Sequence, residues 1–207
     1  MPDVLKDSDN QGLRVRDVSG VILAGGKSSR YGTNKALVEV NGITLIEKVI
    51  GVMQSIFQHV ILITNTPHEY SHLGLPMRQD LIKGLGPIGG IFTALTAIPN
   101  EAGFFVACDM PSLNQGLIRH MVEIRDDFDV VVPRISWKME TLHALYGKGC
   151  IAAIHRLIES KKYQTIQIFP EVSVRYVDEE EIREFDPGLE SFFNVNRPQE
   201  LRRFNKP

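Results

Sequence analysis

The sequence has little cysteine, no long apolar run and no large excess of charge of either sign. Its two cysteines, Cys108 and Cys150, are too few for a disulfide framework and too far apart for a CxxC metal or redox pair. No apolar run approaches the roughly 18–20 residues that cross a bilayer, and the polar N-terminus does not resemble a secretory signal. We therefore expect a cytoplasmic protein without a membrane segment.

The charges nearly balance. Lys and Arg total 23 and Asp and Glu total 25, which gives a net charge of −2. A general electrostatic attraction to nucleic acid or to an acidic membrane is therefore not expected, although a local basic patch is compatible with this balance. The chain of 207 residues is 43% hydrophobic, which is enough for the core of a single domain.

Short apolar runs alternate with amphipathic stretches along the chain. Apolar runs predict strands at 21–24, 60–64, 104–108, 130–133 and 141–146, and helical spacing predicts helices over 46–57, 88–98, 115–125 and 151–158. This alternation is typical of βαβ units and predicts an α/β fold with a mostly parallel sheet. Residues 1–17 lack periodicity and are expected to form a flexible tail. Residues 18–207 are expected to form a single domain that ends in a short helix starting at Asn196.

A glycine-containing basic loop follows the first predicted strand, in the segment LAGGKSSRYGTNK at 23–35. Gly25 and Gly26 would let backbone N–H groups approach an anion closely, and Arg30 and Lys35 would supply positive charge. The pattern predicts a polyphosphate site. It matches neither the Walker A motif, which needs an earlier glycine, nor the dinucleotide fingerprint G-x-G-x-x-G.

This loop resembles the LAGG-x-S-x-R-x-G-x-x-K signature of the molybdenum cofactor guanylyltransferases, the MobA-type nucleotidyltransferases. The resemblance continues, in order, with Asp80, GPIGG at 86–90, CDMP at 108–111 and FNVNRPQEL at 193–201. It implies a three-layer Rossmann-like (GT-A-like) fold and the transfer of GMP from GTP to the phosphate of molybdopterin, with release of pyrophosphate. It also implies Mg²⁺ as the cofactor, and other proteins that make or accept the molybdenum cofactor as further partners.

The resemblance also implies roles for individual residues. Arg30, Lys35 and Asp109 would be catalytic, and Asp109 would be the metal ligand. The nucleotide would lie against Leu23, Ala24, Gly25, Gly26, Lys35, Asn65, Asp80, Pro87, Gly90 and Asp109. Asn194 and Asn196 would lie on the acceptor side.

Several of these positions also have a purely structural interpretation. Asp109 follows a strand, where it can hold Mg²⁺ or cap the helix near 112–115. Asp80 can contact guanine or ribose, or it can lie in a solvated turn, and Asn65 can reach the base or form an Asx-turn. Asn196 fits a helix cap equally well. The 86–90 glycines can approach the nucleotide or form a turn before a helix.

Other functions remain open. The chain can be a related transferase that uses CTP or a sugar-phosphate acceptor, or a catalytically silent nucleotide-binding regulator. The segment 68–72 matches H-E-x-x-H, but Pro67 and Gly74 leave about two turns of helix and no third ligand is marked out for zinc. The single tryptophan, Trp137, is expected to be either a partly buried anchor or a contact for a pterin.

Overall fold

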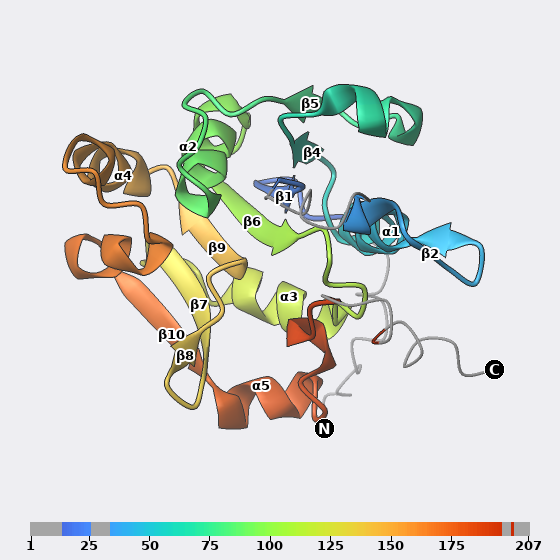
Figure 1. The fold of residues 1–207 in the computed structure, drawn as a ribbon. Coiled ribbons are helices and arrows are strands. Elements are labelled where there is room, and N and C mark those ends of the chain that lie inside the picture. Colours follow the sequence, from blue (N-terminus) through green and yellow to red (C-terminus); the bar gives the residue numbers. More distant parts are fainter. Residues whose placement is uncertain (1–13, 26–33, 196–199, 201–207) are drawn as a thin grey trace, which may run out of the picture.

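The computed structural model describes residues 14–25, 34–195 and 200. They form a central sheet between two layers of helices (Figure 1). The strands are β1 (Val18–Leu23), β2 (Glu39–Val40), β3 (Ile43–Thr44), β4 (Val60–Ile63), β5 (Met77–Arg78), β6 (Ala102–Ala107), β7 (Val130–Ile135), β8 (Lys138–Met139), β9 (His143–Gly147) and β10 (Val174–Asp178). The α-helices are α1 (Leu45–Ile56), α2 (Pro87–Ala97), α3 (Gln115–Glu123), α4 (Cys150–Glu159) and α5 (Glu179–Phe185).

The main sheet has the strand order β10-β7-β9-β6-β1-β4-β5, with β8 paired to β7. Strands β8 and β9 run antiparallel to their neighbours, and the other pairs are parallel. Helices α1, α3 and α5 pack on one face, and α2 and α4 pack on the other (Figure 1). The predicted three-layer α/β fold with a mostly parallel sheet is confirmed.

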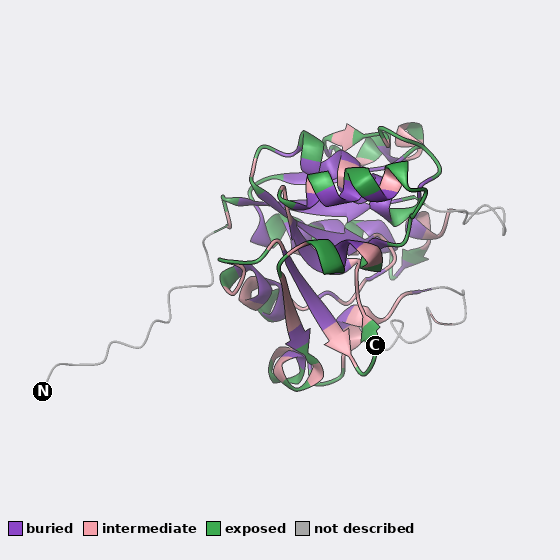
Figure 2. Cartoon of the chain, turned by 90° about the vertical axis from the view of Figure 1, so that its left-hand side faces the viewer, coloured by how far each residue is buried: buried purple, intermediate pink, exposed green. Residues whose placement is uncertain are grey.

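The two central strands are buried along their whole length (Figure 2). Ile22 and Phe104 belong to the core under α1 and α3, whereas Val21 and Phe105 belong to the core under α2 and α4. A strand covered on both faces must be apolar at successive positions, which explains why the sequence shows continuous runs. His143, at the start of β9, is also fully buried, and neither ring nitrogen has a hydrogen-bond partner in the part of the chain that is described.

Helices α1 to α4 begin within one residue of the predicted positions. Thr44 and Glu47 form a capping box at α1, as expected, because each side chain accepts from the other residue's backbone N–H. Pro87 is the first residue of α2, and Gly86 before it has a φ of 68°, a conformation that favours glycine. Within the described residues, no helix is long and apolar enough to cross a membrane.

The sequence analysis missed β10 and α5. It also assigned residues 14–17 to the tail, whereas Val15 pairs with the end of α1: its N–H donates to the Ile56 oxygen at 2.7 Å, and its oxygen accepts from Gln58 N at 2.9 Å. The division of the chain into a tail and one domain stays a prediction. Residues 1–13 and the helix expected from Asn196 lie outside the described residues.

A close contact between β1 and α1 gives a stability prediction. A Cβ at Gly20 would lie 2.9 Å from Phe57 Cδ2 and 3.1 Å from Met53 Cε. We expect Gly20→Ala to lower the free energy of unfolding by about 1–3 kcal/mol, because the core must move to accept the methyl group. The matched control is Gly51→Ala in α1, where nothing lies within 4 Å of a Cβ. It should raise stability by about 0.5–1 kcal/mol. Urea unfolding of both variants tests this, and equal midpoints would contradict it.

Candidate active site

Strands β1, β4 and β6 end side by side, with β1 between the other two. Ala24 N donates to the Ile63 oxygen at 2.9 Å, and Cys108 N donates to the Leu23 oxygen at 3.2 Å. These bonds draw together the residues that follow the three strands. Gly25 is exposed, and among the described residues nothing beyond its chain neighbours lies within 4 Å of a Cβ placed there. In open α/β sheets, ligands bind at such an edge, where the connections leave one strand in opposite directions.

Asp109 follows β6 at this edge and is half-buried. Burial raises the pKa of the Asp109 carboxyl above its ordinary value, while the positive charge of Lys35 acts in the opposite direction. Val195 N donates to the Asp109 backbone oxygen at 3.0 Å, which brings the neighbouring Asn194 to the same edge. Asp109 does not cap α3, because Asn114 holds that position and its side chain accepts a backbone N–H of the first turn.

Lys35 lies next to a hydrogen-bond network around Asn34 that the sequence analysis did not identify. It begins a short 3₁₀ helix (η2, Lys35–Leu37), where the Asn34 side chain accepts from Ala36 N at 3.1 Å. Asn34 Nδ2 in turn donates to Glu69 Oε2 at 2.5 Å and to the Tyr70 hydroxyl at 2.8 Å. Tyr70 is buried, and burial raises its pKa to about 12. Asn34 therefore fixes the start of the short helix that carries Lys35, and its only sequence signal was an asparagine in front of a helix start.

The H-E-x-x-H segment takes part in this network. It lies in the 3₁₀ helix η3 (Pro67–Leu73). With about three residues per turn, positions four apart do not share a face, so the two histidines are not arranged as in an α-helical zinc motif. Across residues 14–25, 34–195 and 200, no three His, Cys, Asp or Glu side chains are grouped so that they could hold a metal ion. The zinc hydrolase alternative therefore has no support in the described geometry.

Asn65 and Asp80 join the ends of β4 and β5. Asn65 Nδ2 donates to Asp80 Oδ2 at 2.7 Å, and Asp80 N donates to Asn65 Oδ1 at 3.2 Å. Gly90, four residues into α2, faces this pair: a Cβ there would lie 3.2 Å from Leu23 Cδ2 and 3.8 Å from Asp80 Oδ1. A carboxylate, an amide and a residue without a side chain thus share one surface next to β1.

The structure brings most of the predicted site residues to this edge. Those described there are Leu23, Ala24, Gly25, Lys35, Asn65, Asp80, Pro87, Gly90, Asp109 and Asn194. Gly26, Arg30 and Asn196 lie outside the described residues, so their roles remain predictions.

Comparison with known proteins places the chain in a family. The family model described as the MobA-like NTP transferase domain matches residues 20–171, which include most of β1, all of β6 and all of the described site except Asn194. The chain belongs to this family. Its members are nucleotidyltransferases, so this MobA-like chain is an enzyme.

Individual MobA-like relatives span nearly the whole chain. A probable molybdenum cofactor guanylyltransferase from Pelotomaculum thermopropionicum is 42% identical over 183 residues, covering 88% of this chain and 89% of the relative. The molybdenum cofactor guanylyltransferase of Desulfosudis oleivorans is 35% identical over 188 residues, covering 90% of this chain and 93% of the relative. A solved structure, the molybdopterin-guanine dinucleotide biosynthesis protein A of Archaeoglobus fulgidus, superposes with a TM-score of 0.78 at 27% sequence identity. The superposition covers 91% of this chain and 97% of that structure. The family resemblance read from the sequence is confirmed.

Proposed function

We propose that this enzyme transfers GMP from GTP to the phosphate of molybdopterin and releases pyrophosphate. The observation that carries the proposal is the placement of Asp109 and Lys35: the half-buried Asp109 carboxylate lies within electrostatic reach of Lys35, the first residue of η2. Such a pairing suits a polyphosphate, because the lysine can neutralise phosphate oxygens while the carboxylate faces the same ligand from the other side. The names of the curated relatives support guanylyl transfer over the cytidylyl alternative.

The reaction needs no protein nucleophile. A phosphate oxygen of the acceptor forms a bond to the α-phosphorus of GTP. The bond from that phosphorus to the oxygen bridging to the β-phosphorus then breaks, and its electron pair leaves with pyrophosphate. The enzyme contributes positioning and charge stabilisation. Lys35 would stabilise the charge that develops on the leaving group, with Arg30 assisting, and the N–H groups around Gly25 and Gly26 would hold the phosphates.

The surface formed by Asn65, Asp80 and Gly90 would hold the nucleoside. Asn65 fixes Asp80 through Oδ2, which leaves Oδ1 next to the buried Gly90, where a side chain would press against Leu23. A carboxylate can accept hydrogen bonds from the N–H groups of guanine or from a ribose hydroxyl. Leu23, Ala24 and Pro87 would provide contacts around this surface.

Nucleotidyltransferases commonly use a divalent metal ion, and the donor set here fits Mg²⁺. Mg²⁺ is bound through one or two carboxylates together with substrate phosphates rather than by an all-protein cage. Asp109, a half-buried carboxylate at the same sheet edge as the exposed Gly25, corresponds to that pattern. Asp109 would hold Mg²⁺ jointly with the triphosphate, and the ion when bound would neutralise negative charge on the phosphates. Asn194 and Asn196 would orient the acceptor phosphate.

The direct test is to incubate the enzyme with GTP, Mg²⁺ and molybdopterin and to identify the product by mass. The guanine dinucleotide of molybdopterin is expected. A product formed only from CTP, or only with a sugar phosphate, would replace the proposal by the related-transferase alternative. Selective GTP binding without pyrophosphate release would identify a silent regulator instead. We place the reaction in the cytoplasm, because both cysteines are free, and we expect proteins that supply or accept the molybdenum cofactor to be its partners.

Lys35→Ala should lower kcat by about 10–100-fold, because the charge on departing pyrophosphate loses a partner. The measurement is pyrophosphate release at saturating GTP, with Lys148→Ala as the control. Lys148 pairs with Glu101 at the opposite edge of the sheet, so its loss should leave kcat unchanged. Normal turnover by Lys35→Ala would remove this lysine from the mechanism.

A further inference from the structure

An open hollow of about 730 Å³ lies at the far end of the same sheet edge, away from the nucleotide surface. It is lined by Arg134, Ser136, Trp137, Met139, Asp178, Glu179 and Glu180. Strands β7 and β10 run in the same direction as β6, because β9 between β6 and β7 is antiparallel to both. Their carboxyl ends therefore point to the edge that carries Asp109. At about 4.8 Å between strands, the end of β7 lies roughly 10 Å from that of β6, and the end of β10 roughly 14 Å.

The most exposed large side chain of this hollow is Trp137. It occupies the two-residue turn between β7 and β8, next to Ser136, whose φ is 54°, and it is 96% exposed. The expectation of a partly buried anchor is therefore wrong. A tryptophan normally buries a large apolar area, so an indole held in solvent on a tight hairpin is costly unless a ligand covers it.

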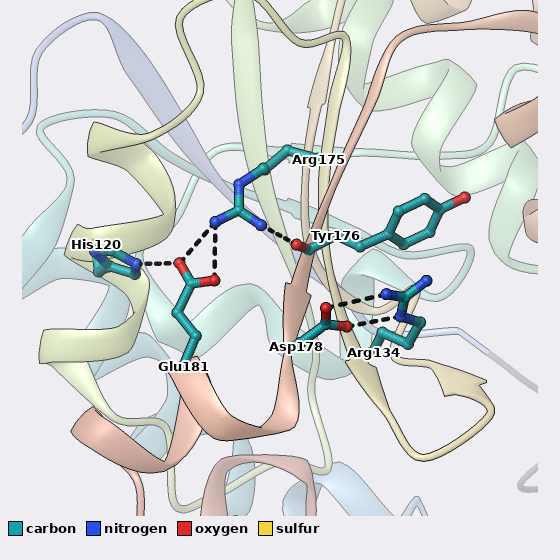
Figure 3. Close-up of polar contacts among 6 residues, drawn as sticks. All are labelled: His120, Arg134, Arg175, Tyr176, Asp178 and Glu181. Carbon is teal, nitrogen blue, oxygen red and sulfur yellow. Dashed lines mark hydrogen bonds and ion pairs between the residues drawn. The ribbon is translucent and has the colours of Figure 1, made fainter.

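The charges of the hollow are not those of a phosphate site. Arg134 is held by Asp178 through two hydrogen bonds, of 2.7 Å and 3.0 Å, and stacks over the Tyr176 ring at 4.8 Å (Figure 3). The Asp178 carboxylate beside it raises the pKa of Arg134, and Arg134 lowers the pKa of Asp178. The guanidinium is therefore already neutralised by a carboxylate, and the remaining lining charge is acidic.

Glu180 is the lining carboxylate with an unused side chain. Glu179 accepts hydrogen bonds from Arg183 at 2.8 Å and 3.1 Å, and Asp178 is engaged by Arg134. Glu180 is exposed, and no hydrogen bond or ion pair joins it to another described residue. A carboxylate without a partner next to an exposed indole suits a flat heterocycle whose edge carries adjacent N–H donors.

We propose that Trp137 and Glu180 bind the pterin end of the acceptor, with the indole stacked on the ring and the carboxylate accepting from its 2-amino and adjacent N–H groups. This inference rests on the proposed function. Molybdopterin carries its phosphate at one end and its pterin ring at the other, so a phosphate near Asp109 leaves the ring free to extend along the edge. The two residues determine acceptor specificity and do not take part in the chemical step.

The single tryptophan provides a direct binding measurement. A pterin absorbs where tryptophan emits, so neopterin monophosphate added to the nucleotide-free enzyme should quench the intrinsic fluorescence. Glu180→Gln should weaken this quenching about tenfold. Glu184→Gln, an exposed change on the same helix, should not affect it. Quenching by GTP alone would mean that the hollow binds guanine, and it would overturn the proposal. The absence of any quenching by the pterin would overturn it as well.

Steady-state kinetics supply the second measurement. Trp137→Ala should raise the KM for molybdopterin about tenfold while leaving kcat and the KM for GTP unchanged, and Trp137→Phe should restore most of the affinity. Unchanged KM for molybdopterin in an active enzyme would overturn this inference alone. Failure of the wild-type enzyme to make the dinucleotide would instead overturn the proposed function, because the fluorescence result is independent of turnover.

Discussion

Asp109→Asn is expected to reduce kcat by about a thousandfold without lowering the thermal unfolding midpoint. The amide keeps the shape of the side chain but loses the negative charge that would hold Mg²⁺ against the triphosphate. Burial already raises the pKa of Asp109, so the native state bears a cost for keeping this group ionised, and a neutral amide removes that cost. Activity and stability should therefore change independently.

Calorimetry separates the metal role from a general loss of binding. The wild type should bind GTP more tightly with Mg²⁺ than without it, and Asp109→Asn should lose that difference while retaining its metal-free affinity. The control is Asp127→Asn, an exposed change in the segment before β7, at the opposite edge of the sheet. A fully active Asp109→Asn enzyme, or one that keeps the Mg²⁺ dependence, would exclude Asp109 as the metal ligand.

His143→Leu is expected to flatten the acid dependence of stability. Burial lowers the pKa of His143 from 6.5 to about 3, although the charge of Asp186 acts in the opposite direction. The unfolded chain therefore binds a proton below pH 6.5 that the folded chain does not bind until about pH 3. The stabilisation that His143 gives when neutral is complete above pH 6.5 and is lost as the pH falls towards 3. Its slope reaches about 1.4 kcal/mol per pH unit.

Leucine does not titrate, so the variant should lack this slope between pH 6.5 and 4, a difference of about 3 kcal/mol across the window. At pH 7.5 it should be at least as stable as the wild type, because two ring nitrogens without partners are replaced by carbon against Phe104 and Phe192. Urea unfolding at a series of pH values measures this. The control is the exposed His59→Gln. Parallel pH curves for His143→Leu and the wild type would contradict the prediction.

The strands and helices that bury an apolar face could be predicted from the sequence. The predicted runs lie on β1, β4, β6, β7 and β9 because burial imposes a local pattern. The elements that were missed are the edge strand β10 and the helix α5 that follows it, and charged pairs stabilise them. Arg175 donates to Glu181 at 2.8 Å and 3.0 Å, and His120 meets the same carboxylate at 2.7 Å (Figure 3). Such tertiary pairs leave no periodic signal.

Some residues of the candidate site could likewise be predicted from the sequence, and others could not. Asp109 and Gly25 could be located because each lies two residues after the end of a buried strand, and the carboxyl ends of parallel strands meet. The contact of Asn34 with Glu69 and Tyr70 could not be predicted, because it joins segments about 35 residues apart through side chains alone. The reciprocal hydrogen bonds between Asn65 and Asp80 likewise depend on the register of β4 against β5, which cannot be predicted from the sequence.

The inverted direction of β9 has a consequence for how substrate choice can change. Residues 136–142 connect β7 to β9 and include β8, which pairs with β7. Both ends of this connection are fixed, because β7 and β9 pair with each other and β9 pairs with β6. Insertions or exchanges within it would not shift the register of β1 against β6 or β4. Under the proposed function, the choice of the second substrate could therefore be changed by replacing this one short segment, while the nucleotide-binding strands β1, β4 and β6 stay unchanged.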